Sequence, residues 1–190
     1  MKNFLNKLAM IAAIVPVYQE NGDVTMVVYQ DGTNDIVPLR VRAVIRKIAH
    51  TYCTDLIQLK KKTAEITDRS LYNTLVFDQS LILIPLKTRK PRVPGDNTLA
   101  YVNLKAVVKT LPSPAPPHRS VIQLTGGHTV PIYWTPVRVK QYLNQAELIS
   151  QKLIDKLPRY QKQKEDEPEL NAVAQKLAEL LNEIVKVKGS

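Results

Sequence analysis

In the first part of the chain, short apolar runs are separated by polar turn residues, a pattern that predicts antiparallel strands. The first strand is predicted within the apolar run of residues 8–17, and the second at residues 24–29. Asn21-Gly22-Asp23 lies between them, and Asn-Gly supplies the positive φ angles of a tight hairpin turn. The run 8–17 has ten residues and is too short to cross a bilayer, so no membrane association is expected.

Further strands are predicted from short apolar runs that turn residues bound on both sides. Four prolines within residues 112–117 remove too many backbone donors for a strand interior or a helix, so this segment is expected to be a stiff surface loop. Gly126-Gly127 marks the turn of a later hairpin. The strands predicted in this way cover residues 56–66, 71–77, 81–86, 101–108, 121–124 and 129–133.

Two helices are expected within the same domain. Between residues 39 and 52, apolar side chains alternate with arginines at helical spacing, which predicts a basic amphipathic helix after Pro38. No second short helix is expected close to it, so the pattern does not indicate a helix-turn-helix motif. Thr135-Pro136 predicts the start of a longer helix, with Thr as its cap and Pro at the first helical position, and Pro158 ends it.

The chain is expected to have a C-terminal appendage. A β-rich domain of residues 1–157 is followed by a polar linker, 158–167, and by an amphipathic helix, 168–188. This helix carries a heptad stripe that can pair with a second copy of the chain. The stripe spans only about two and a half heptads, so docking onto its own domain is equally open. The oligomerisation residues are predicted to be Leu170, Val173, Leu177, Leu180, Ile184 and Val187. The predicted fold class is α+β, a mostly antiparallel sheet domain closed by a long helix, with a C-terminal helical extension.

The charge of the chain is positive and unevenly distributed. The 190 residues are 44% hydrophobic and 23% charged, which is typical of a globular protein, and the net charge is +10. Residues 36–109 contain 14 Lys or Arg against 5 Asp or Glu, whereas residues 155–190 contain 7 of each. A concentrated surplus is typical of proteins that bind polyanions. A basic protein whose charge only keeps it in solution is the alternative.

Cations next to predicted strands are the candidates for phosphate binding. Four of them lie within the six residues 87–92, where prolines on both sides restrict the backbone. Rigid strands can direct such a loop at a phosphate backbone. Three lysines, expected between the strands predicted at 56–66 and 71–77 or on an exposed strand edge, extend the positive surface, although lysines on an edge strand also prevent aggregation. The candidate nucleic-acid-binding residues are therefore Lys60, Lys61, Lys62, Lys87, Arg89, Lys90 and Arg92.

Residues that could carry catalysis or bind a metal ion are few and scattered. His118 and His128 are expected to face solvent, and together with His50 they lack Cys or carboxylate partners at metal-ligand spacing, so neither a metal site nor a cofactor is expected. The single cysteine, Cys53, excludes an internal disulfide and is interpreted as a small buried apolar residue. Glycine-rich nucleotide-binding motifs are absent. The sequence favours a protein that is not an enzyme, with a small enzyme built on Cys53 as an alternative.

From about Met10 to Ile149 the order of features resembles the competence transcription factor (ComK) family of bacterial DNA-binding activators. The resemblance is carried by Ile82-Leu-Ile-Pro85, by Tyr101-Val102, by Val121–Pro131 around Gly126-Gly127, and by the following helix with Gln145. The family's Gly-Ser-Ser-Tyr-x-Gly-Arg segment falls near Ala49–Asp55, where Tyr52 matches and both glycines and the arginine do not. The resemblance therefore does not imply recognition of the same DNA sites.

The resemblance implies an activator of DNA-uptake genes that binds A·T-rich sites. The lack of a membrane span and the single cysteine predict a cytoplasmic protein, and the expected function is that of a sequence-specific transcriptional regulator that acts without a cofactor. Its loop cations would neutralise phosphates or enter a narrow A·T minor groove. Residues 101–104 and 121–127 also look like the end of a LytTR-type DNA-binding domain, another β-rich DNA binder. The expected partners are double-stranded DNA, a second copy of the chain and a regulatory protein. The alternative from another class is a protein–protein adaptor whose terminal helix binds its partner and whose basic face is only solubilising.

Overall fold

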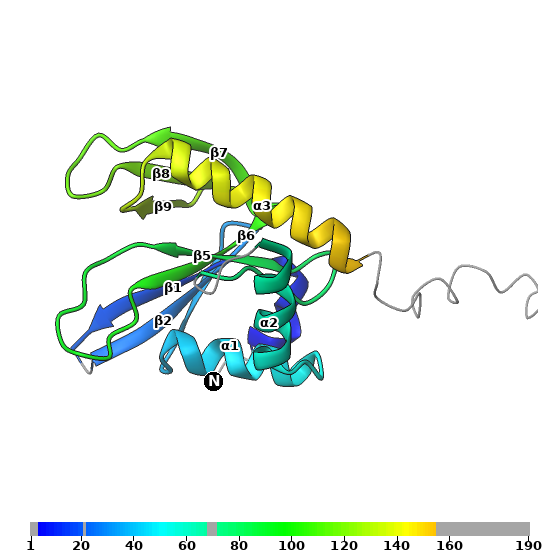
Figure 1. Ribbon diagram of the computed structural model, residues 1–190. Coiled ribbons are helices and arrows are strands. Elements are labelled where there is room, and N and C mark those ends of the chain that lie inside the picture. Colours follow the sequence, from blue (N-terminus) through cyan, green and yellow to red (C-terminus); the bar gives the residue numbers. More distant parts are fainter. Residues whose placement is uncertain (1–3, 21, 68–71, 155–190) are drawn as a thin grey trace, which may run out of the picture. The chain divides into compact units, whose positions relative to one another are not determined.

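The computed structural model of the chain describes residues 4–20, 22–67 and 72–154 (Figure 1). The chain divides after Asp155, and all of the described residues belong to the first of its two units. The predicted linker 158–167 and the predicted helix 168–188, with its six oligomerisation residues, lie outside the described residues.

Within the described residues, six strands form an antiparallel sheet in the order β3-β2-β1-β6-β5-β4. The predicted hairpin is confirmed, because Val17 pairs with Val24 on the two sides of its turn. The first strand begins later than predicted, since Phe4–Met10 form a 3₁₀ helix, η1. The six strands are β1 Ile11–Gln19, β2 Gly22–Tyr29, β3 Asn34–Val37, β4 Leu75–Val76, β5 Ile82–Lys87 and β6 Leu99–Asn103.

A second, three-stranded sheet has the order β7-β8-β9 and comprises β7 Val107–Pro112, β8 Ser120–Leu124 and β9 Thr129–Ile132. The hairpin predicted around Gly126-Gly127 is confirmed. The single strand predicted at 101–108 is wrong, because the chain leaves the first sheet at Asn103. The buried Asn103 amide donates to the carbonyls of Ile11 and Ser80, at 2.8 Å each, and a 3₁₀ turn, η2 (Leu104–Ala106), then leads to β7.

Three α-helices complete the described part of the chain: α1 Val41–Thr51, α2 Leu56–Thr67 and α3 Pro136–Ile154. The basic helix predicted at 39–52 is confirmed as α1. The helix predicted from Thr135-Pro136 is confirmed as α3, with Arg138 N donating to the Thr135 hydroxyl at 3.4 Å. The strand predicted at 56–66 is wrong, because these residues form α2. Asp55 Oδ1 caps α2 by accepting from the backbone N–H groups of Ile57 and Gln58, at 2.7 and 3.3 Å.

The six-stranded sheet is buried on both faces (Figure 1). Successive residues of a strand point to opposite faces. Val27 of β2 therefore belongs to the buried cluster that contains Ile48 of α1, whereas Val28 belongs to the cluster that contains Ile122 of β8 and Tyr142 of α3. The predicted α+β class is confirmed: a mostly antiparallel sheet domain is closed by the long helix α3, α1 covers the other face, and α2 stands beside the edge strand β4.

Two histidines hold the small sheet to loops of the large one. His118 Nε2 lies 2.9 Å from the Thr88 carbonyl oxygen, and His128 Nε2 lies 2.8 Å from that of Gly32. Both side chains are half-buried, so the expectation that they face solvent is wrong. Their hydrogen bonds fix the position of the second sheet over the first.

Candidate nucleic-acid interface

The outer side of α1 is basic. Val44 and Ile48 are fully buried against the sheet, while Arg42, Arg46 and Lys47 are exposed. With 3.6 residues per helical turn, residues four apart lie on the same side, which places Arg42 and Arg46 in one stripe. Because the inner side of the helix is locked into the core, these arginines project from a rigid support.

The lysines Lys60, Lys61 and Lys62 lie in the middle of α2, and all three are exposed. The expectation that they lie between strands or on a strand edge is wrong. The helix is held by Leu59, which is 9% exposed, and by the fully buried Thr63, whose hydroxyl donates to the carbonyls of Leu59 and Thr74, at 3.0 and 3.1 Å. Burial of these inner side chains leaves the three lysines facing away from the core.

The connection between α1 and α2 is the four-residue segment Tyr52–Asp55. Cys53 has a φ of 48°, in the left-handed region, and the Thr54 N–H donates back to the Ala49 carbonyl at 2.8 Å. The Tyr52 hydroxyl donates to Asp78 at 2.8 Å, which ties the connection to the sheet. Cys53 is exposed, so its interpretation as a buried residue is wrong.

We call the outer side of α1 and α2 the helical surface; its cations are Arg40, Arg42, Arg46, Lys47, Lys60, Lys61 and Lys62. Only two carboxylates, Asp55 and Glu65, lie within residues 40–67. Asp55 is occupied in capping α2. Within the part of the chain that the structure describes, none of the seven cations takes part in an ion pair. The helical surface therefore carries a positive charge that is not neutralised locally.

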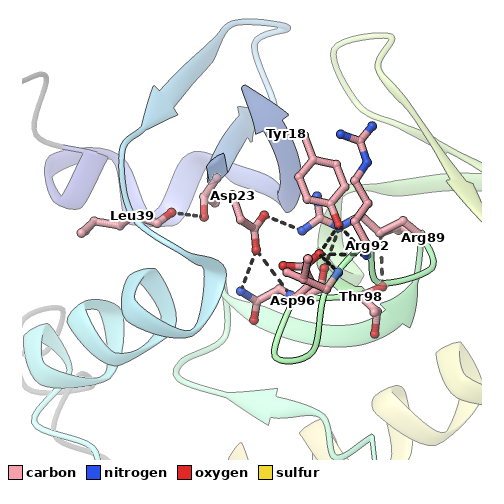
Figure 2. A network of polar contacts seen from close by, with 11 residues as sticks. Tyr18, Asp23, Leu39, Arg89, Arg92, Asp96 and Thr98 are labelled. Carbon is pink, nitrogen blue, oxygen red and sulfur yellow. Dashed lines mark hydrogen bonds and ion pairs between the residues drawn. The ribbon is translucent and has the colours of Figure 1, made fainter. Parts of the chain in front are cut away.

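The predicted basic loop between β5 and β6 is a folded structure, and Arg89 is part of its interior (Figure 2). The Arg89 side chain is 14% exposed and forms an ion pair with Asp23 of β2, whose side chain is 3% exposed. Its Nε donates to the Asn97 carbonyl at 2.7 Å, and its guanidinium carbon lies 3.8 Å from the centre of the Tyr18 ring. Arg89 is thus bound within the protein, and we remove it from the candidate interface.

A second carboxylate orders the tip of the same loop. Asp96 accepts hydrogen bonds from the Tyr18 hydroxyl and from the backbone N–H groups of Arg92 and Val93, the latter two at 2.9 and 3.1 Å. The hydrogen bond from Tyr18, followed by those from the backbone, keeps the pKa of Asp96 below its ordinary value. Arg92 stacks on Tyr18, with its guanidinium carbon 4.1 Å from the ring centre, but its side chain stays exposed.

The remaining loop cations form a second, smaller positive surface, the loop surface, which consists of Lys87, Lys90 and Arg92. Lys90 and Arg92 are exposed and Lys87 is half-buried. In Figure 1 this loop lies at the left end of the large sheet, whereas α2 lies at the right. The structure therefore does not bring the two sets of predicted residues together, and Lys60, Lys61 and Lys62 do not extend the positive surface of the loop.

The sequence-based selection also omitted the three cations of α1, Arg42, Arg46 and Lys47, and Arg40 directly before it. The structure exposes them at α1, which the four-residue segment Tyr52–Asp55 joins to the helix that carries Lys60, Lys61 and Lys62. Asp55 was the available signal, because an Asp directly before an apolar residue favours a helix start. A helix starting there would have placed α2 next to α1.

Comparison with known proteins adds no relative: no family model, no curated protein and no solved structure matches this chain. Within the described residues, no group of three or more His, Cys, Asp or Glu side chains is arranged to hold a metal ion. None of the described helices is long and apolar enough to cross a membrane.

Proposed function

We propose that the protein binds duplex DNA through the helical surface and acts as a sequence-specific transcriptional regulator. The observation that carries this proposal is a set of seven exposed cations, six on two rigid helices and Arg40 directly before the first helix. None of them takes part in an ion pair in the described part of the chain. Such cations displace counterions condensed on DNA, and this release drives binding. A shape argument agrees, because two helices joined by a turn of three or four residues are typical of DNA-binding helix-turn-helix motifs.

The loop surface has a subordinate part in this proposal. Lys90 and Arg92 project from a loop that two carboxylates have already ordered, so little further entropy is lost when they meet a phosphate. The resemblance to the competence transcription factor family extends the proposal to an activator of DNA-uptake genes that recognises A·T-rich sites. That extension rests on the resemblance alone.

The test is the salt dependence of binding to a labelled duplex. If all seven cations of the helical surface meet phosphates, the slope of log affinity against log salt is expected to be about −6. Lys60→Ala, Lys61→Ala and Lys62→Ala together should reduce that slope by about two to three, depending on whether Lys61 meets a phosphate or a base. These side chains are exposed, so the folded state should survive, which circular dichroism would verify.

The matched control is the double variant Lys87→Ala with Lys90→Ala on the loop surface. We expect it to change the slope by less than the triple variant, even after correction for the number of lysines removed. A larger effect per lysine at the loop would move the interface there. Absence of binding to any duplex, or a slope near zero, would refute the proposed function.

A protein–protein adaptor is the second candidate, and it is favoured by apolar side chains on the outside of α3. Val137 is 70% exposed and Leu148 is 48% exposed. They are eleven residues apart, about three helical turns, and so lie on the same side of the helix. A DNA affinity that Val137→Glu with Leu148→Glu leaves unchanged would assign this side of α3 to something other than DNA.

A further inference from the structure

We infer that α2 is the element that reads base edges in the major groove, with Ile57, Gln58 and Lys61 facing the floor of the groove. The inference rests on the proposed function and deepens it. It assigns sequence recognition to one helix and gives each of three side chains a chemical partner.

The outer face of α2 follows from its buried face. Successive residues of an α-helix are about 100° apart, so the residues opposite Leu59 and Thr63 are Ile57 and Lys61, with Gln58 beside them. The burial of α2 agrees, since Leu59 and Thr63 are buried while Ile57, Gln58 and Lys61 are exposed. In Figure 1, α2 stands at one side of the unit with no other element in front of it.

The two remaining lysines lie on the flanks of this face. Lys60 and Lys62 are each about 100° from Lys61, on opposite sides of the helix. A helix with side chains is about 10–12 Å wide and fills a major groove that is about 12 Å wide. Cations on the two flanks therefore come to the two phosphate backbones that border the groove. This arrangement suits a helix lying in the groove better than one lying across a single strand.

The central side chains have the chemistry of base readers. Ile57 is the most exposed of the large apolar side chains in the described residues, at 75%, and it lies among cations. A thymine methyl group would bury it. The Gln58 amide both donates and accepts, as adenine N6 and N7 require, and Lys61 can donate to guanine O6 and N7. Glu65, one turn further along, can accept from cytosine N4.

The hydrogen bonds that fix α2 to the rest of the domain support this role, because a helix that recognises bases must present its side chains in a fixed orientation. Asp55 fixes the first turn through the N–H groups of Ile57 and Gln58, the two residues proposed to contact adjacent bases. The Thr63 hydroxyl fixes the middle of the helix through the carbonyl of Thr74, just before β4. The helix is therefore anchored both along and around its axis.

The first test is selection of bound fragments from random duplex DNA, carried out with the wild-type chain, Ile57→Ala and Gln58→Ala. We expect wild type to select sites with an A·T pair that Gln58→Ala no longer prefers, a loss of about tenfold in discrimination at that position. Val137→Ala and Gln141→Ala are matched controls, since both replace exposed side chains on α3, and both should leave the selected site unchanged.

The second test uses modified bases in the selected duplex. Replacing each thymine in turn by uracil removes only the 5-methyl group. One such replacement should weaken wild type about fivefold and have no further effect on Ile57→Ala, because the two changes remove the same contact. Replacing adenine by 7-deazaadenine removes the N7 acceptor. This replacement should weaken wild type and have no further effect on Gln58→Ala.

The outcomes separate the inference from the function on which it rests. If duplex DNA is bound but both variants keep the wild-type site, or no preferred site emerges, α2 is not the reading helix and the inference is overturned. If no duplex is bound at any salt concentration, the proposed function itself is refuted.

Discussion

Replacing Gly126 by alanine tests how the second sheet is held on the first. The turn between β8 and β9 touches the turn between β2 and β3 at a contact between two glycines. Gly126 has a φ of +80°, and a Cβ atom there would lie 2.4 Å from Gly32 N and 2.8 Å from the Gln30 carbonyl oxygen. Both are backbone atoms of a turn, so no side chain can rotate away to make room.

The expected loss of stability has three parts. An alanine in the left-handed region costs about 1 kcal/mol. To escape the clash with Gly32, the turn must also move by about an ångström, which strains the local packing by about 1–3 kcal/mol. This movement breaks the 2.8 Å hydrogen bond from His128 to the Gly32 carbonyl, which is worth about 1 kcal/mol. We therefore expect Gly126→Ala to lower the free energy of unfolding by about 3–5 kcal/mol, a large share of a typical total of about 5–15 kcal/mol.

Gly127→Ala is the matched control. Gly127 has a φ of +84°, but a Cβ atom there would meet nothing within 4 Å, so only the cost of the left-handed conformation remains, about 1 kcal/mol. Urea unfolding followed by the fluorescence of the single tryptophan, Trp134, measures both variants, because Trp134 is buried between the small sheet and α3. Equal losses in the two variants would refute the close contact between the two turns.

Two further outcomes are expected. The hydrogen bond from Tyr18 lowers the pKa of Asp96 from 3.8. The ionised Asp96 carboxylate therefore stabilises the fold above that pH, and this stabilisation is lost as the pH falls below it. Asp96→Asn should weaken the acid dependence of unfolding, which urea unfolding at about pH 3 and about pH 6 would measure. A chain ending at Pro168 should show a lower mass by light scattering than the full chain, because it lacks the predicted heptad stripe; an equal, monomeric mass for both would contradict self-association.

The features that the sequence predicted correctly depend on neighbouring residues. Asn21-Gly22 and Gly126-Gly127 require turns wherever they occur, and the apolar runs on both sides then pair as hairpins. Thr135 caps α3 for an equally local reason. In each case a few adjacent residues contain the whole physical cause, and no distant contact can alter the result.

The error at residues 56–66 has a different origin. The inner face of α2 consists of Leu59 and Thr63, and a threonine interrupts the apolar periodicity that indicates a helix. Thr63 is nevertheless fully buried, because its hydroxyl donates to the carbonyls of Leu59 and Thr74. The second carbonyl belongs to a residue eleven positions away. A buried polar side chain that is satisfied by a distant carbonyl cannot be recognised from the hydrophobic pattern.

In the basic loop, the sequence likewise does not reveal which cation is bound within the protein. In the sequence, Arg89 and Lys90 are equivalent neighbours, but Arg89 pairs with Asp23, 66 residues earlier, whereas Lys90 stays exposed. Removing Arg89 would leave the nearly buried Asp23 without its cation, at a cost of about 3 kcal/mol. Weaker DNA binding by Arg89→Ala would then be inseparable from loss of folded protein. Lys90→Ala removes a neighbouring charge and leaves the Arg89–Asp23 ion pair intact. Of the two variants, only Lys90→Ala therefore reports on contact between the loop and DNA.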